Sequence, residues 1–216
     1  MRPALLAVLV LATSACFASS DAPQASTAPV PAGAYTLDKS HTSLVFRVSH
    51  LGFSTYTGRF TKLDARLQFD PRNIAGSRVS VDIDPRSIEA DNAPSGFLQS
   101  LAGRDWLDAE QFPRLSFNSK SVELTGRDSF RIHGELTLHG VTRPLTLDAR
   151  YNGGYAGHTY EPKARVGFSA RGEFKRSDFG MGQFVPAAGS SFGVGDRIEV
   201  ILESEFSGPP LRTPEQ

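Results

Sequence analysis

Cysteine is nearly absent from this sequence, in which Cys16 is the only one among 216 residues. A single cysteine excludes a disulfide within the chain and a cysteine-rich zinc site. A surplus of either charge is also missing, because 23 basic side chains balance 23 acidic ones. That balance argues against a nucleic-acid partner, since proteins that bind the phosphate backbone carry an excess of Lys and Arg. The length fits one domain with a core large enough to fold without cross-links.

The sequence also lacks the machinery that we would expect of an enzyme. A Gly-x-Ser-x-Gly nucleophile elbow, a His-Glu-x-x-His zinc site and a phosphate-binding loop are not expected. Asp38 and His41 lie close together in the chain, but no nucleophile accompanies them. His133, His139 and His158 show no metal-ligand spacing, so no metal site is predicted.

The first 34 residues differ in composition from the rest of the chain. A short basic start precedes an apolar run at residues 4–12 that is too short to span a bilayer. Small residues follow, and residues 1–16 are therefore predicted to be a secretory signal peptide. Two processing routes remain open, namely lipidation of Cys16 as in a bacterial lipoprotein or ordinary cleavage near Ala18. Residues 17–34 are rich in Ala, Pro, Ser and Thr and are expected to form a flexible tether.

Alternation of apolar and polar residues characterises residues 35–207, which we assign to one folded domain followed by a disordered tail at 208–216. About eight strands are expected, and most have one apolar and one polar face. Such a pattern is typical of an up-and-down barrel or a sandwich. The clearest alternating segments are residues 42–50, 56–69, 78–84, 130–149, 164–174 and 198–206.

Residues 130–149 read as two strands joined by a two-residue turn at His139-Gly140. Glycine readily adopts the positive φ that such a turn needs, and histidine tolerates it. The implied register pairs Leu138 with Val141, Ile132 with Leu147, Phe130 with Ala149 and Gly134 with Leu145. This register places the apolar residues on one face, and a slip of one residue would break the agreement. Gly134 is expected to leave room on the apolar face.

Residues 91–112 interrupt the strand pattern. Pro94 is expected to open a short helix and Gly103 to close it, with Phe97, Leu98 and Leu101 at helical spacing. The insert is either a plug that closes one end of the sheet or a mobile lid.

Several segments, in this order and spacing, resemble the YceI-like polyisoprenoid-binding proteins. They are Tyr35-Thr-Leu-Asp38 with His41 and Phe46-Arg-Val-Ser-His50, Gly58-Arg-Phe60, Trp106-Leu-Asp-Ala-Glu-Gln-Phe-Pro113 with Phe117, Gly134-Glu-Leu-Thr-Leu-His-Gly-Val-Thr-Arg-Pro-Leu-Thr-Leu147, and Arg176-Ser-Asp-Phe-Gly-Met181. The resemblance covers residues 35–206. One departure is clear, because an Asp-x-His-Leu run that is frequent in the family is replaced here by Ser95-Gly96-Phe97-Leu98.

The resemblance implies an all-β fold, an eight-stranded antiparallel lipocalin-like β-barrel with a short helical insert, in a protein secreted to the periplasm or cell envelope. It implies non-catalytic binding, transport or storage of an isoprenoid lipid, either a quinone or a polyprenyl phosphate. No cofactor is expected besides this lipid. Two other functions stay open: a secreted enzyme with His41 and Asp178 as acid and base, or a protein-interaction module. A membrane anchor at Cys16 and a homodimer also stay open.

The expected site combines an apolar tunnel with polar residues at its mouth. The tunnel is expected to be lined by Phe46, Val48, Phe60, Phe97, Leu101, Phe117, Ile132, Gly134, Leu136, Leu147, Phe168, Ala170, Phe174 and Phe179. The same residues would also suit a solid core. His41 would either pair with Asp38 or meet the head group, and His50 would be a core residue or a ligand contact. Arg176 would either pair with Asp178 or bind an anionic head group.

Overall fold

The structure is a computed structural model that describes residues 29–158 and 160–210. The expected signal peptide, Cys16, most of the tether and the end of the tail lie outside the described residues. Strand β1 already begins at Gly33 and strand β10 continues to Pro210. The barrel strands therefore extend slightly beyond the 35–207 domain expected from the sequence.

Ten strands and four short helices make up the described chain. In order they are β1 (Gly33–His50), β2 (Ser54–Phe60), β3 (Leu63–Phe69), η1 (Ile74–Gly76), β4 (Arg78–Ile83), η2 (Pro85–Ser87), β5 (Ile88–Glu89), α1 (Phe97–Ala102), β6 (Leu115–Leu124), β7 (Ser129–Leu138), β8 (Val141–Tyr155), β9 (Lys163–Lys175), η3 (Arg176–Phe179) and β10 (Val194–Pro210). Helices labelled η are single turns of 3-10 helix. No helix in the described part of the chain is long and apolar enough to cross a membrane.

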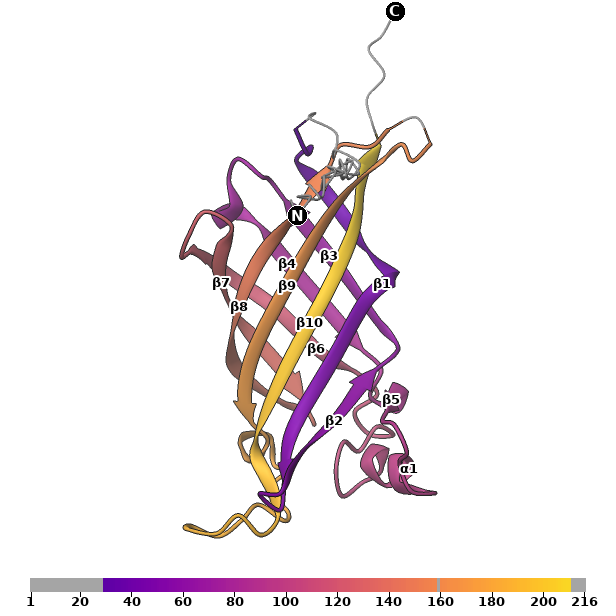
Figure 1. The fold of residues 1–216 in the computed structure, drawn as a ribbon, viewed down its shortest axis with the longest axis vertical. Helices are drawn as coiled ribbons and strands as arrows, with labels where there is room; N and C mark the ends of the chain where they lie inside the picture. Colours follow the sequence, from indigo (N-terminus) through magenta and orange to yellow (C-terminus); the bar gives the residue numbers. More distant parts are fainter. Residues whose placement is uncertain (1–28, 159, 211–216) are drawn as a thin grey trace, which may run out of the picture.

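Eight of the strands close into an antiparallel barrel (Figure 1). Closure occurs because β1 pairs with β10 on one side and with β3 on the other. Strand β2 pairs with the second half of β1, and β5 adds a short edge to β2. Residues 61–62 interrupt the strand that follows β1. The part before the break, β2, pairs with the second half of β1, and the part after it, β3, pairs with the first half. The prediction of an eight-stranded antiparallel barrel is confirmed.

The hairpin of β7 and β8 has the register predicted from the alternation. Leu138 pairs with Val141, Ile132 with Leu147 and Gly134 with Leu145. His139 and Gly140 both adopt positive φ, at 52° and 72°. This is the combination that a two-residue turn needs to match the twist of its strands. The turn contacts neighbouring segments, since His139 Nδ1 lies 3.1 Å from the carbonyl oxygen of Phe179.

Aromatic side chains close the end of the barrel at which β1 begins and β10 ends. Phe69 packs edge-on against Tyr35 and Phe168, with ring centroids 6.0 and 5.5 Å apart. Tyr35 and Phe69 are fully buried, and Phe206 belongs to the same cluster. Burial raises the pKa of Tyr35 to about 12. We call this end the closed end and the opposite end the mouth.

Helix α1 lies at the mouth, beside β2 and β5 (Figure 1). Gly96 precedes it with a φ of 78°, and Gly103 ends it as the sequence predicted. Pro94 does not open the helix, which begins three residues later, because the left-handed Gly96 intervenes as its N-cap. The helix contacts the barrel through Phe97, whose ring lies 5.9 Å from that of Tyr56.

Candidate functional site

The mouth half of the barrel encloses an apolar cavity of about 490 Å³, which we call the main cavity. Most of the apolar positions expected from the sequence lie on its wall. They are Phe46, Val48, Phe60, Phe97, Leu101, Phe117, Leu136, Leu147, Ala170 and Phe174. Residues from α1 and the following turn also line it, so the insert covers the mouth side of the cavity. The interior is therefore hollow in this half and packed in the other.

Four expected tunnel residues lie elsewhere. Ile132 and Phe168 line a second, much smaller cavity of about 70 Å³ toward the closed end. Phe179 is buried in the core beneath Phe174, at a ring distance of 5.3 Å. Gly134 does not leave room for a ligand, because the ring of Phe117 fills that space: a Cβ at Gly134 would lie 2.4 Å from Phe117 Cζ.

The expected tunnel is in fact a blind cavity. Side chains shared by the walls of both cavities separate them, among them Val81, Phe117 and Leu202. Beyond the small cavity the aromatic cluster closes the barrel. A bound molecule can therefore enter and leave only at the mouth.

Arg176 is the only Lys, Arg, Asp or Glu among the described residues that line the main cavity. Its side chain is buried, and each guanidinium nitrogen donates to a backbone carbonyl, at Gly195 (2.9 Å), Val194 (2.8 Å) and Met181. The guanidinium also lies 5.4 Å from the ring centre of Trp106, within the range of a cation–π contact. Burial lowers the pKa of Arg176. Arg176 thus holds the start of β10 against the preceding connection.

The expected ion pair between Arg176 and Asp178 is wrong, because Arg176 bonds to carbonyls and Asp178 is exposed. Asp196, and not Asp178, is the carboxylate that fixes this segment. Its carboxylate accepts hydrogen bonds from the backbone and hydroxyl of Ser177, both at 2.9 Å. His50 is exposed and lies at the mouth of the main cavity, where it can reach a ligand.

Tyr56 is a site residue that the sequence reasoning missed. Its ring lines the main cavity, and its hydroxyl is buried without a hydrogen-bond partner among the described residues. Desolvation raises the pKa of Tyr56, so the hydroxyl stays protonated and can donate. The parity that it shares with Gly58 and Phe60 could have identified it as an inward side chain.

His41 does not lie at the mouth, as one interpretation of the sequence had it. A register shift in β1 between Asp38 and Ser43 places it on the outer wall. There its Nδ1 lies 3.0 Å from Asp38, the other arrangement expected from the sequence. Arg165 also donates to Asp38 and, at 3.2 Å, to Glu205. Three potential metal ligands meet here, Asp38, His41 and Glu205, but Arg165 already donates hydrogen bonds to both carboxylates.

Replacing Asp38 with Asn is expected to destabilise the barrel in a pH-dependent way. Arg165 and His41 hold the pKa of the Asp38 carboxyl well below its usual range, and Asp38 raises the pKa of His41. The Asp38 contribution is present above its unfolded pKa of about 3.9 and is lost as pH falls toward the folded value. The His41 contribution is full below about pH 6.5 and is lost as pH rises through its folded pKa.

Urea unfolding from pH 3 to 9 checks this expectation. At pH 7 we expect Asp38→Asn to cost about 1–3 kcal/mol, as for loss of a charged hydrogen-bond partner. The loss in the free energy of unfolding should be largest between about pH 4 and 6.5, where both contributions are present. Asp148→Asn is the control, because its pair with Arg131 is exposed and should be nearly neutral. A loss for Asp38→Asn that does not vary with pH would contradict this account.

His41 and Asp178, the pair considered as acid and base, do not meet at the main cavity. His41 and Asp178 lie near opposite ends of β10, near Glu205 and Arg197 respectively, a separation of about 26 Å at the rise of a strand. The expectation of no Gly-x-Ser-x-Gly was wrong, since residues 189–193 read Gly-Ser-Ser-Phe-Gly. They lie in the connection that leads into β10, however, and not between a strand and a helix as in a nucleophile elbow.

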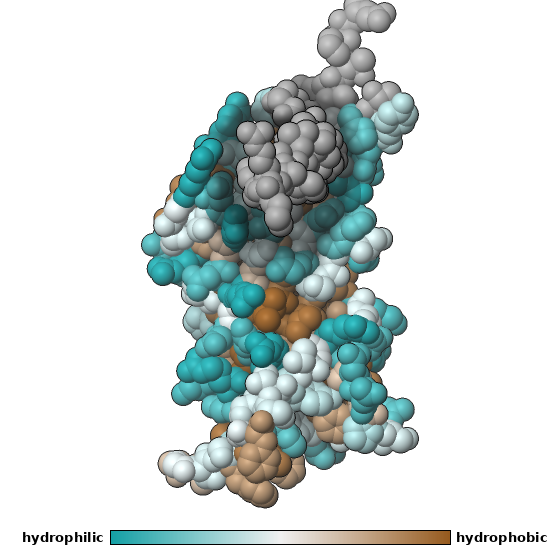
Figure 2. All heavy atoms as spheres, in the orientation of Figure 1, coloured by the Kyte–Doolittle hydropathy of each residue, from teal (hydrophilic) through white to brown (hydrophobic). Residues whose placement is uncertain are grey.

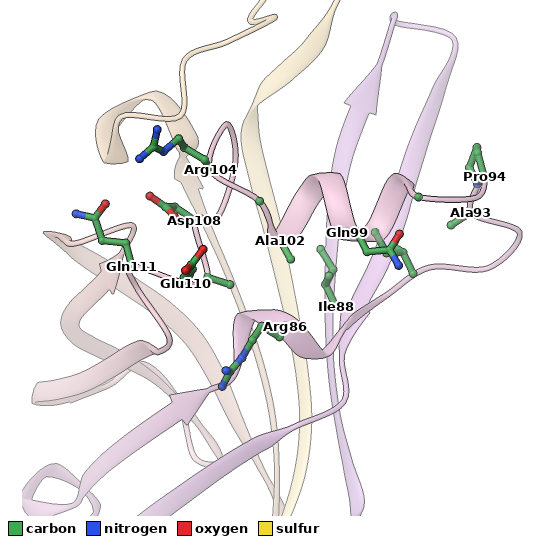
Figure 3. A pocket seen from close by; sticks show the side chains of 14 residues that line it. Arg86, Ile88, Ala93, Pro94, Gln99, Ala102, Arg104, Asp108, Glu110 and Gln111 are labelled. Carbon is green, nitrogen blue, oxygen red and sulfur yellow. The ribbon is translucent and has the colours of Figure 1, made fainter.

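A second hollow of about 1000 Å³ lies on the outer side of the insert. Figure 3 shows α1 at one side of it and Arg104, Asp108, Glu110 and Gln111 at the other. Charges of both signs border this hollow, whereas the main cavity has an almost wholly apolar wall. Pro94 and Ile88 line both, so the insert is the partition between them.

Comparison with known sequences gives relatives over most of the chain. A model of the YceI-like domain matches residues 35–206. A UPF0312 protein of Vibrio cholerae is 35% identical over 149 residues, which cover 68% of this chain and 77% of that protein. A UPF0312 protein of Yersinia pestis shows the same identity over 149 residues, covering 68% of this chain and 75% of its own.

Solved structures share the fold. The YceI protein of Campylobacter jejuni superposes with a TM-score of 0.62 at 28% identity and covers 74% of this chain and 90% of its own. Burkholderia cenocepacia BcnA gives a TM-score of 0.67 at 21% identity, covering 78% and 98%. A polyisoprenoid-binding domain from Saccharophagus degradans gives 0.58 at 16% identity, covering 81% and 98%. From the match over residues 35–206 and the relatives at 35% identity, the chain belongs to the YceI-like family.

Proposed function

We propose that this protein is a non-catalytic carrier that holds the tail of an isoprenoid lipid in the main cavity. The observation that carries the proposal is a cavity of about 490 Å³ with an almost entirely apolar wall, blind at one end and open at the other. The name of the Saccharophagus degradans domain, which shares this fold, is consistent with such a ligand. A signal peptide at residues 1–16 would direct the carrier to the periplasm or cell envelope.

The size of the cavity supports an apolar occupant. If the space of 490 Å³ stayed dry, the coefficient for voids in protein cores would put its cost at about 12 kcal/mol, and water that entered through the mouth would meet an almost entirely apolar wall. A hydrocarbon chain removes that cost, and each buried methylene contributes about 0.8 kcal/mol. Ten methylenes would contribute about 8 kcal/mol, which corresponds to micromolar binding before entropic costs.

The polar groups favour a neutral head group, such as a quinone, over a phosphate. All three nitrogens of Arg176 are already bonded to carbonyls. A phosphate carries up to about two negative charges, whereas Arg176 offers one positive charge and only the two N–H groups that its carbonyl bonds leave over; burying the remaining charge without a partner is unfavourable. The hydroxyl of Tyr56 is unpartnered, and it can donate to a ring carbonyl or hydroxyl once a rotation of the side chain turns it toward the cavity. One neutral hydrogen-bond acceptor on the head group is enough to pair with this hydroxyl.

Replacing Tyr56 with Phe tests this assignment. We expect affinity for an isoprenoid quinone to fall about tenfold, the value of one hydrogen bond. Affinity for a polyprene of the same length without a head group should not change. Stability should rise by about 1 kcal/mol, because the variant removes an unpaired buried hydroxyl. Quenching of the single Trp, Trp106, which lines the cavity, measures binding.

The control is Ser77→Ala, which removes the other unpartnered buried hydroxyl of the described chain, outside the main cavity. It should raise stability without changing affinity. Tighter binding of a polyprenyl phosphate than of the quinone by the wild-type protein would overturn the choice of head group. Failure to bind any isoprenoid would overturn the carrier function itself.

A further inference from the structure

Three exposed phenyl rings lie on two neighbouring loops at the mouth of the barrel. Phe53, Phe184 and Phe192 are 84%, 70% and 78% exposed. Phe53 belongs to the turn between β1 and β2, and the other two belong to the connection at residues 180–193. Figure 1 shows both loops at the end opposite to the start of β1 and the end of β10, and Figure 2 shows apolar surface at that end. We call these three side chains the rim.

The two loops are fixed to each other and to the cavity wall. The backbone amide of Leu51 donates to the carbonyl of Gly193 at 2.8 Å, and that of Val194 donates to Phe184 at 2.8 Å. Phe184 has a φ of 58°, a left-handed conformation that bulky residues rarely adopt. Its ring stacks on Trp106 at 6.1 Å, and Trp106 lines the main cavity. The apolar surface is therefore continuous from the rim to the interior.

Charge is missing from the same loops. Residues 180–193 contain no Asp, Glu, Lys or Arg, and neither do residues 51–57, although charged residues make up 21% of the chain. A protein partner recognised through ion pairs would find no counterpart here. Exposed aromatic rings on an uncharged surface are instead suited to the boundary between head groups and acyl chains in a bilayer.

We propose that the rim docks on the surface of a lipid bilayer, with the mouth of the main cavity facing the acyl chains. The inference rests on the proposed function, because a carrier of isoprenoid lipids must collect its cargo from a membrane. Each methylene of the tail lowers the equilibrium concentration of the lipid in water, relative to an apolar phase, about fourfold. Docking lets the tail pass between bilayer and cavity without crossing water. Because the cavity is blind, its one entrance must face the bilayer for this to happen.

Sedimentation with vesicles tests the docking directly. All proteins carry Cys16→Ser, so that no acyl anchor can contribute, and the vesicles are phosphatidylcholine without any isoprenoid. The rim variant Phe53→Ser/Phe184→Ser/Phe192→Ser is compared with Leu124→Ser/Tyr160→Ser, which removes exposed apolar residues away from the rim. Because Phe184 also supports Trp106, a second variant, Phe53→Ser/Phe192→Ser, leaves that stack in place.

We expect vesicle binding to fall at least about tenfold in the triple variant and in the same direction in the double variant, but not in the control. Binding should change little between low salt and 0.5 M salt, since no charges take part. A wild-type protein that fails to bind these vesicles, or a rim variant that binds as well as the wild type, would overturn the proposal.

The carrier function is judged separately, by loading an isoprenoid quinone from detergent solution. Rim variants should load normally from detergent but slowly from vesicles that contain the quinone. Loss of loading from detergent in the wild-type protein would count against the carrier function, and not against docking.

Discussion

Filling the main cavity with Ile198→Trp/Val200→Trp is expected to abolish isoprenoid binding while the barrel remains folded. Both side chains lie on the cavity wall in β10, and neither is fully buried, so larger rings have space to occupy. If the two rings displace about five methylenes of the ligand, about 4 kcal/mol of binding is lost. That loss is about a thousandfold in affinity. Isothermal titration calorimetry with an isoprenoid quinone measures this affinity.

The matched control is Arg197→Trp, which adds the same ring on the outer face of β10. Arg197 forms an exposed ion pair with Glu173, whose loss should cost little. The control should bind the quinone as the wild type does. Urea unfolding should place the cavity-filling variant within about 2 kcal/mol of the wild type. Unchanged affinity in a folded cavity-filling variant would show that the ligand binds elsewhere.

Substituting Gly134 with Ala is expected to destabilise the barrel wall strongly. A Cβ at this position would lie 2.4 Å from Phe117 Cζ and 2.6 Å from the carbonyl oxygen of Asn118. The ring can rotate away, but the backbone oxygen cannot move without disturbing the pairing of β6 with β7. We expect a loss of about 2–4 kcal/mol in the free energy of unfolding, measured by urea denaturation.

Two further variants make this expectation specific. Gly167→Ala, in β9, is the control, because a Cβ there meets only ordinary contacts at 3.8 and 3.9 Å. It should be neutral or slightly stabilising, since alanine restricts the unfolded chain. Adding Phe117→Leu to Gly134→Ala should recover part of the loss by removing the colliding ring. If Gly134→Ala proves neutral while ligand affinity falls, Gly134 faces ligand space after all.

Alternation along single strands predicted the β7–β8 register and limited the fold to a barrel or a sandwich, and the resemblance to YceI-like proteins selected the barrel. The side-chain period of a strand is two, so one-residue slips expose apolar residues and are strongly disfavoured. The two-residue turn at His139-Gly140 fixed the same register independently. Inward positions such as Phe46, Leu136 and Phe174 followed from parity alone and lie on the cavity wall.

Contacts between strands could not be predicted in the same way. Parity correctly placed Gly134 on the inner face but could not show that Phe117, from the adjacent strand, fills the space above it. Of the two expectations for His41, the position at the mouth was wrong, because the irregularity in β1 between Asp38 and Ser43 leaves His41 on the outer wall. The partner that fixes Asp38, Arg165, lies 127 residues away in the chain. Nor does strand parity reveal that aromatic rings close one end.

Native mass spectrometry of the protein isolated from its own cells without added lipid tests the central claim most directly. Organic extraction of the same sample identifies any bound molecule. The account predicts one isoprenoid lipid with a neutral, oxygen-bearing head group per chain, and its absence from Ile198→Trp/Val200→Trp. A wild-type protein that repeatedly carries no lipid, or carries the same molecules as that variant, would contradict it.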